Sequence, residues 1–305
     1  MPKRAPRYTA EGVAAWLAAG AREKDECVRN PDYLAVKFLG TKYYLISQFP
    51  PLVKLVLWCF QQVVPGGYYF HIARTKHIDV TRKHCLAEGL DQLVVLGAGY
   101  DSRAYRFREL LGKTKVFEVD HPGTQEYKKL RLARMYGTVP QWVTFVAMDF
   151  NKERLEIRLP QSGYDPGGKT FFIWEGVCMY ISPAAVDMAL SFVARHSGAG
   201  SSIVFDFLYR SVIEGTCDYY GAREAARYVA RVGEPYVFGI EEGDAARFLE
   251  ESGFELVSEL GPEQLQKAYL IRGDGSLHGR VYGYTGIAHA RVKSRPGSTG
   301  ADKSG

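Results

Sequence analysis

A glycine turn, Gly97-Ala98-Gly99, directly follows the apolar run VVL and passes at once into a helical stretch. Glycines can adopt backbone angles closed to other residues and have no Cβ to hold a ligand off, and the following helix N-terminus offers free N–H groups. A lone Gly-x-Gly is weak evidence, and Ser102 stands where a dinucleotide fingerprint has its third glycine. The turn therefore favours a nucleoside-type ligand over a pyrophosphate.

Acidic residues end the next two predicted strands. KVFEVD ends in Glu118 and Asp120, roughly 20 residues after the glycine turn, where an acid can accept hydrogen bonds from ribose hydroxyls. The third strand ends in Asp149 and Phe150. That carboxylate can accept a hydrogen bond from the exocyclic amine of an adenine, whose ring would pack on the aromatic side chain. Either aspartate can instead cap the helix that follows it.

The fourth predicted strand ends in Glu175, after the strongly apolar run FFIW. Charged groups are seldom left in such a place without a partner. The partner can be the ammonium or sulfonium of a cofactor, or an arginine such as Arg74 in an internal salt bridge. Arg74 and Arg22 lie in the helical region that precedes the strands. Either can grip a cofactor carboxylate with its planar guanidinium, and either can equally be a surface charge.

Short β-rich runs that alternate with helical stretches must position these residues. We expect strands at 94–97, 115–120, 142–149, 170–176 and 201–207, with helices at 101–112, 123–136, 151–158 and 183–196 between them. This alternation predicts a doubly wound α/β fold, in which ligands bind at the carboxyl ends of mostly parallel strands. Runs at 253–260 and 279–292 bring the sheet to seven strands, the last of them antiparallel.

Helical additions flank this core. Residues 10–28 and 52–88 predict helices, the second region broken at Pro65-Gly66-Gly67, so we expect an N-terminal helical cap over 1–90 and a core over 91–292. The apolar window 51–65 is too short to cross a bilayer and predicts a buried helix, with a membrane-surface role as the minor alternative. The polar, tyrosine-rich segment at about 208–240 predicts a helical lid. Residues 293–305 are poor in apolar side chains and are expected to be disordered.

Composition excludes several functional classes. Residues near the two ends account for the whole net charge of +5, so the body is nearly neutral and no nucleic-acid partner is expected. The five cysteines form no Cys-x-x-Cys pair and the histidines show no ligand spacing, which predicts reduced thiols, no metal and a cytoplasmic location. No membrane partner is expected. The oligomeric state stays open, a homodimer included.

Four motifs taken together, VVLGAGYDSRAYR, FEVDHP, AMDF and WEGVCMYISP, resemble the leucine carboxyl methyltransferase family and its bacterial relatives. These are class I methyltransferases that use S-adenosylmethionine, and the match in order and spacing runs from about residue 21 to 291. The departures Val95 and Asp101 from the wider methyltransferase pattern also occur in this family. The resemblance implies one role for each matched residue: Gly97 and Gly99 at the glycine-rich turn, Asp120 on the ribose, Asp149 and Phe150 at the adenine, Glu175 near the methionine amine, Arg74 at its carboxylate, and Arg22 as a second carboxylate contact.

A sulfonium methyl is already activated, so such an enzyme has mainly to align a nucleophile and exclude water. We expect an O-methyltransferase acting on a small-molecule carboxylate or hydroxyl, rather than on a protein C-terminus. Tyr180, just past the fourth strand, is the candidate that orders the acceptor or stacks on the sulfonium, although an ordinary half-buried tyrosine also fits. Tyr219, Tyr220 and Tyr228 are weaker candidates.

Two other functions remain open at this point. The amine of S-adenosylmethionine can attack its own γ-carbon, which would make the protein a cyclase or lyase that releases methylthioadenosine. The protein can also be a non-catalytic S-adenosylmethionine-binding protein. The nucleoside product discriminates among these alternatives.

Overall fold

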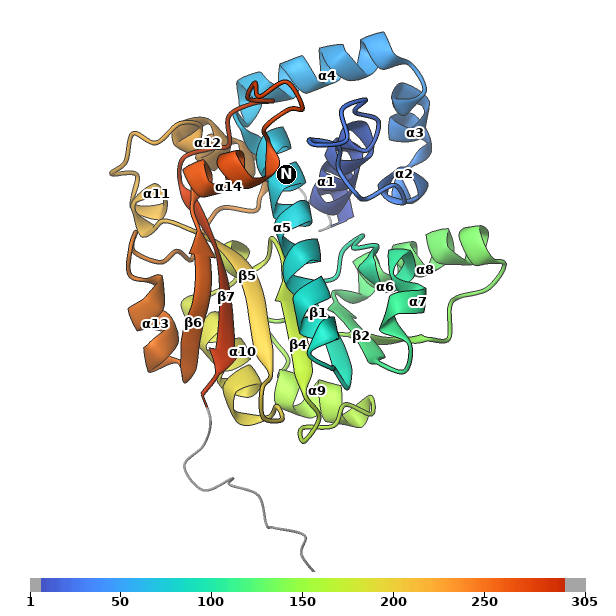
Figure 1. Ribbon diagram of the computed structural model, residues 1–305, viewed down its shortest axis with the longest axis vertical. Coiled ribbons are helices and arrows are strands. Elements are labelled where there is room, and N and C mark those ends of the chain that lie inside the picture. The colour runs from blue at the N-terminus through green and yellow to red at the C-terminus, as the bar shows by residue number, and fades with distance from the viewer. Residues whose placement is uncertain (1–6, 294–305) are drawn as a thin grey trace, which may run out of the picture.

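The computed structural model describes residues 7–293, and it confirms the mostly parallel seven-stranded sheet, with helices against both faces (Figure 1). The strands lie in the order β3-β2-β1-β4-β5-β7-β6, and β7 runs antiparallel to both of its neighbours. Their bounds are β1 Gln92–Leu96, β2 Lys115–Asp120, β3 Val143–Ala147, β4 Thr170–Trp174, β5 Ser202–Leu208, β6 Phe254–Leu260 and β7 Thr285–Val292. The order reverses between β1 and β4, which is the switch point where such sheets bind ligands.

Five helices precede the sheet: α1 Arg7–Gly20, α2 Ala35–Phe38, α3 Thr41–Ser47, α4 Pro50–Val63 and α5 Gly67–Ala87. Within the alternating region lie α6 Arg103–Arg106, α7 Arg108–Leu111, α8 Pro122–Tyr136, α9 Leu155–Gln161, the 3-10 helix η1 Cys178–Tyr180 and α10 Pro183–Arg195. After β5 come α11 Arg210–Glu214, α12 Ala222–Val232, α13 Ala245–Glu251 and α14 Pro262–Tyr269. Helices α11 and α12 fall in the segment for which the sequence predicts a lid.

The core lies where the sequence has continuous apolar runs. Every residue of β1, β4 and β5 is buried, because helices cover both faces of these central strands. The edge strands β3 and β6 mix buried residues with partly or fully exposed ones. The carboxyl ends of the central strands are therefore fixed on a rigid framework.

Two predictions for single elements were wrong. The strand expected over 279–292 begins only at Thr285, because the residues before it pack on α5, Gly279 against the ring of Tyr69 and Tyr282 against Phe70. The apolar helix expected to be buried, α4, has no buried residue.

Other boundaries differ less. The predicted break at residues 65–67 is confirmed, and Gly66 has φ +81° there, with no room for a Cβ beside the backbone of Tyr282. The helix expected over 10–28 ends at Gly20, and α2 and α3 were not predicted. The predicted disordered tail, except for its first residue, lies outside the described residues.

Candidate functional site

The glycine turn after β1 has the conformation that its sequence requires. Gly97 and Gly99 have φ +67° and +44°, the left-handed region that favours glycine. A Cβ on Gly97 would lie 2.2 Å from Cγ2 of Val177 in the loop after β4, so glycine is also needed for close packing. At Gly99 the nearest side-chain atom would be Cβ of Ala10, at 3.7 Å. The more open position of the turn is therefore Gly99.

Asp120 lies beside this turn. Its carboxylate accepts hydrogen bonds from the backbone N–H groups of Gly99 and His121, and burial raises the pKa of Asp120. Glu118, two residues earlier, is instead held in the core by an ion pair with Lys128 at 2.8 Å. Burial raises the pKa of Glu118 to about 7. Of the two acids that end this strand, only Asp120 reaches the carboxyl edge of the sheet.

Asp149 and Phe150 follow β3 at the same edge. The Asp149 carboxylate accepts from the N–H of Asn151 at 3.1 Å and pairs with Lys152 at 2.9 Å, a hydrogen bond that lowers the pKa of Asp149. It thus closes a turn well before α9 begins. Phe150 lines a cavity of about 330 Å³ between α9 and α10, together with Met148 and other side chains.

Glu175, the acid after β4, lies between two arginines from different elements. Its Oε1 is 3.0 Å from Nη2 of Arg74 on α5, and its Oε2 is 2.6 Å from Nη1 of Arg103 on α6. Arg74 also donates through Nη1 to Asp206 of β5, at 2.6 Å. The internal salt bridge, which was one of the two sequence-based alternatives for Glu175, is therefore present.

Around this network the charges are tightly partnered. Arg103 also pairs with Asp79, at 2.7 Å, and with Asp101. Asp206 accepts from the N–H of Gly176 at 2.6 Å. Among the described residues the buried Nε of Arg74 has no hydrogen-bond partner. The Nε–H group of Arg74 is thus available as a donor within the network.

His71 adjoins the same network, with Nδ1 2.8 Å from Nη2 of Arg74. Burial lowers the pKa of His71 well below its usual value, so the imidazole is neutral. Since a guanidinium can only donate, Nδ1 of His71 must be the acceptor in this hydrogen bond.

Tyr180 belongs to an aromatic cluster that we define as Phe70, Tyr180, Tyr236, Tyr282 and Tyr284. The rings of Tyr180 and Tyr236 lie 5.5 Å apart, while Tyr282 is 4.4 Å from both Phe70 and Tyr284. Burial raises the pKa of Tyr180 well above its ordinary value and that of Tyr236 to about 12. These phenols are neutral near pH 7 and can donate hydrogen bonds.

The remaining candidates lie elsewhere. Arg22 is exposed in the turn after α1. Tyr219 donates a hydrogen bond to Glu242 at the surface, and the Arg280 guanidinium lies over the ring of Tyr220. Tyr228 on α12 packs against the core. None of these observations ties them to the network around Glu175.

Sequence reasoning missed His71, Arg103 and Asp206. Asp206 was within reach, because it lies near the end of the fifth strand and the strand-end argument applies to it as well. Arg103 and His71 carry no such signal, since their partners come from distant parts of the chain.

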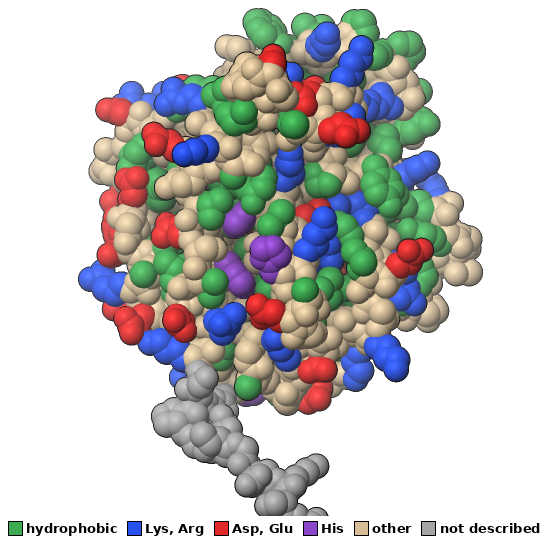
Figure 2. Space-filling model, viewed as in Figure 1, with side chains coloured by type: hydrophobic (Ala, Val, Ile, Leu, Met, Phe, Trp, Pro, Cys, Tyr) green, Lys and Arg blue, Asp and Glu red, His purple; other side chains and the backbone are tan. Residues whose placement is uncertain are grey.

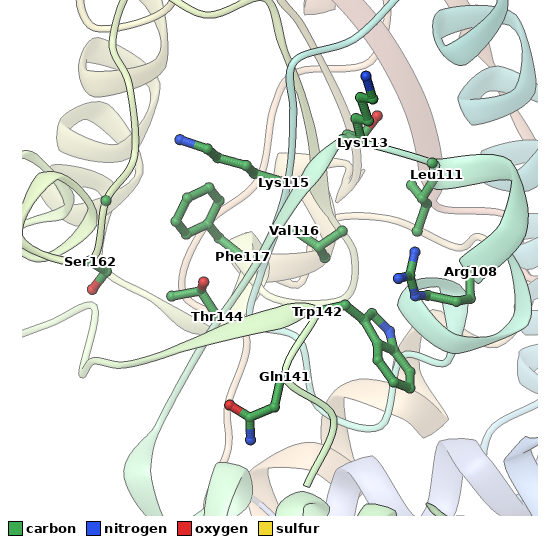
Figure 3. A pocket seen from close by; sticks show the side chains of 13 residues that line it. Arg108, Leu111, Lys113, Lys115, Val116, Phe117, Gln141, Trp142, Thr144 and Ser162 are labelled. Carbon is green, nitrogen blue, oxygen red and sulfur yellow. The ribbon is translucent and has the colours of Figure 1, made fainter.

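A larger cavity, of about 480 Å³, lies at the opposite edge of the sheet (Figure 3). Lys115 and Phe117 from the start of β2 and Trp142 before β3 line it, with Arg108 beside the indole. Because ligands of such folds bind at the carboxyl ends of the strands, this cavity is not the candidate site. Within residues 7–293 no group of three or more His, Cys, Asp or Glu is placed to hold a metal ion.

The chain is similar to known proteins in both sequence and fold. The model of the leucine carboxyl methyltransferase family matches residues 10–194. The chain is 31% identical over 225 residues to the Bacillus subtilis (strain 168) protein named "Putative S-adenosyl-L-methionine-dependent methyltransferase YktD", covering 73% of this chain and 72% of that protein. It is 35% identical over 206 residues to a Streptomyces coelicolor protein of the same description, SCO7813, covering 68% and 70%.

Among solved structures, a DUF574 family protein from Streptomyces avermitilis shares the fold, with a TM-score of 0.60 at 15% identity over 86% of this chain and 95% of that one. The family match contains the glycine turn, Asp120, Asp149, Glu175 and Tyr180. Asp206 and the cluster residues Tyr236, Tyr282 and Tyr284 lie beyond it.

Proposed function

The chain belongs to the leucine carboxyl methyltransferase family and is an S-adenosylmethionine-dependent methyltransferase, and we propose that it methylates a carboxylate or hydroxyl oxygen of a small molecule. The observation that carries this proposal is the aromatic cluster. Phe70 of this cluster lies 5.2 Å from the Arg74 guanidinium, so the cluster adjoins the charged network. Aromatic rings and neutral phenols beside charged groups suit a compact, partly apolar acceptor.

The side chains at the carboxyl edge match the chemistry of S-adenosylmethionine. Its ribose hydroxyls need an acceptor, for which we assign Asp120. Its adenine needs an acceptor and an apolar surface, for which we assign Asp149 and Phe150. Its methionine part carries a carboxylate and an ammonium, for which we assign Arg74 and Glu175. The unpartnered Nε of Arg74 supports this assignment.

Binding a zwitterion at Arg74 and Glu175 leaves no charge unpaired. The internal pair would be exchanged for two pairs, one for each end of the amino-acid group. Arg74 keeps Asp206 as a partner and Glu175 keeps Arg103, so both side chains stay oriented during the exchange. We therefore assign Arg103 and Asp206 as positioning residues.

The sulfonium supplies an activated methyl group, so the residues of this chain have to align the acceptor oxygen and exclude water. Tyr180, as a neutral phenol, can donate a hydrogen bond to the acceptor but cannot remove a proton from it near pH 7. An acceptor that arrives ionised needs no base. We therefore expect carboxylic acids to be methylated faster than alcohols.

We also propose a cytoplasmic location. All five cysteines are free thiols, and Cys27 and Cys59 are exposed. Exposed free thiols suit a reducing compartment.

Product analysis tests the proposed function. The purified protein is incubated with S-adenosylmethionine alone and then with a panel of carboxylic acids, phenols and alcohols, and the products are identified by mass. We expect S-adenosylhomocysteine and a methyl ester or ether. Methylthioadenosine formed without any acceptor would establish the cyclase alternative, and cofactor binding with no product across the panel would establish the non-catalytic one.

A paired variant tests the assigned role of Tyr180. Tyr180→Phe should raise the KM for the acceptor several-fold and leave cofactor affinity unchanged. Tyr219→Phe, which removes a surface hydroxyl, is the matched control and should change neither quantity. An unchanged acceptor KM in Tyr180→Phe would remove Tyr180 from the acceptor site.

A further inference from the structure

Helix α4 carries large apolar side chains on its surface. None of its 14 residues is buried, although most of them are apolar. Trp58 is 63% exposed and Leu55 is 54% exposed. A helix that is apolar on most of its faces is normally covered by other parts of a protein or by lipid. Helices α3, α5 and α12 contact α4, and in the described part of the chain they leave its outward face, with Leu55 and Trp58, exposed.

The exposed side chains continue from α3 into α4. We define the α3–α4 surface as the exposed side chains of Tyr44, Leu45, Phe49, Leu52, Leu55, Trp58 and Val63. Figure 2 shows apolar side chains with cations among them over the upper right of the molecule, where these two helices lie. Contiguous exposed apolar surface of this kind marks an interaction site.

The charges around this surface are mostly positive. The sequence from residue 33 to 78 contains no Asp or Glu, while Lys42 and Lys54 are exposed on α3 and α4. Helix α12 packs against α4 and adds the exposed Arg227 and Arg231, against a single acid, Glu224. A partner of this surface must therefore accept apolar side chains and supply negative charge.

A second copy of the chain does not meet this requirement. A two-fold symmetric contact through α3 and α4 would bring Lys42 and Lys54 of both copies into one interface, and neither helix supplies a carboxylate to neutralise them. An anionic lipid surface meets both requirements, because acyl chains accept the apolar residues and headgroup phosphates pair with lysines.

We propose that the α3–α4 surface docks on the headgroup region of an anionic phospholipid bilayer. Phe49, Leu55 and Trp58 enter the boundary between headgroups and acyl chains, and Lys42 and Lys54 contact phosphates. In the described part of the chain no helix is long and apolar enough to span a bilayer, so the contact lies on the surface. The α4 helix lies at the end of the molecule where the parallel strands have their carboxyl ends, so docking turns that end toward the lipid (Figure 1).

Vesicle co-sedimentation of the full chain tests this proposal. The wild type should sediment with vesicles that contain phosphatidylglycerol, less with vesicles of phosphatidylcholine alone, and less in high salt. Leu55→Glu and Trp58→Glu should each reduce the bound fraction roughly tenfold or more, because each removes an inserted apolar side chain. Leu130→Glu, at a position 62% exposed on α8, is the matched control and should bind as the wild type does.

Cofactor affinity should be the same in all four proteins, which verifies that the variants are folded. The proposal is overturned if the wild type does not sediment with phosphatidylglycerol vesicles, or if the two α4 variants bind as well as Leu130→Glu. It is also overturned if light scattering shows a lipid-free dimer that Leu55→Glu converts to a monomer, because the surface would then be an interface between copies.

Discussion

Removal of the Asp120 carboxylate should weaken cofactor binding and leave the sheet intact. In the structure this side chain accepts the N–H groups of Gly99 and His121, so it both shapes the glycine turn and presents an acceptor at the edge of β2. Asp120→Ala removes both functions. Asp120→Asn keeps the size and one oxygen, but places an amide NH2 where a second acceptor stood.

The magnitude follows from the hydrogen bonds that are lost. A buried acceptor whose partner is left unsatisfied is worth about 1–3 kcal/mol. For Asp120→Ala this corresponds to a dissociation constant raised about 5- to 150-fold. Asp120→Asn should fall between the wild type and Asp120→Ala, because one of its two acceptor oxygens remains.

Isothermal titration with S-adenosylhomocysteine measures the change. Asp165→Ala is a suitable control. Like Asp120, Asp165 accepts a hydrogen bond from a glycine N–H, that of Gly167 at 2.8 Å, but it lies in the loop before β4, at the opposite edge of the sheet. Affinity should be unchanged in this control. If Asp120→Ala, shown to be folded by circular dichroism, binds as tightly as Asp165→Ala, the assignment of Asp120 to the ribose is refuted.

Four further predictions concern single residues. Gly89→Ala introduces only the strain of a positive φ, about 1–2 kcal/mol, because the space around Gly89 is open. Gly97→Ala should lower the free energy of unfolding by more than this, because its Cβ would also collide with Val177. Equal losses of stability for the two variants in urea unfolding would contradict the close packing. The pKa of Glu118 is raised to about 7 from an ordinary 4.5, so the free energy of unfolding should fall by up to about 3 kcal/mol as pH rises from 4.5 to 7. Glu118→Gln should flatten this part of the plot of stability against pH. Burial lowers the pKa of His77 to about 4, so stability from this residue is lost as pH falls from about 6.5 to 4, and an identical acid limb in His77→Gln would disprove it. Glu175→Gln should raise the cofactor dissociation constant about 10- to 150-fold with little loss of stability, since both arginines keep other carboxylates, and unchanged affinity in titration would exclude Glu175 from the methionine subsite.

The sheet could be predicted because its central strands are buried on both faces, so they read as continuous apolar runs such as FFIW before Glu175. The strand-end acids could be predicted for the same reason, because a carboxylate directly after a buried strand needs a partner. The sequence did not show which side chains pair with these acids. Only the fold shows that Glu175 meets two arginines and that Glu118 is held by Lys128.

The errors have a common cause, which is packing between distant segments. Apolar composition predicted a buried α4, yet composition does not say whether any other element reaches that helix. The run before Thr285 has strand-like residues, but the contacts of Gly279 with Tyr69 and of Tyr282 with Phe70 hold it against α5. Such contacts are not encoded in any local pattern.

A crystal structure of the protein with S-adenosylhomocysteine tests the central claim most directly. We expect density at the carboxyl ends of β1 to β4, with the ribose against Asp120 and the amino-acid group between Arg74 and Glu175. Density at the cavity beside Lys115 and Trp142, or an intact Arg74–Glu175 pair with the ligand bound elsewhere, would contradict it.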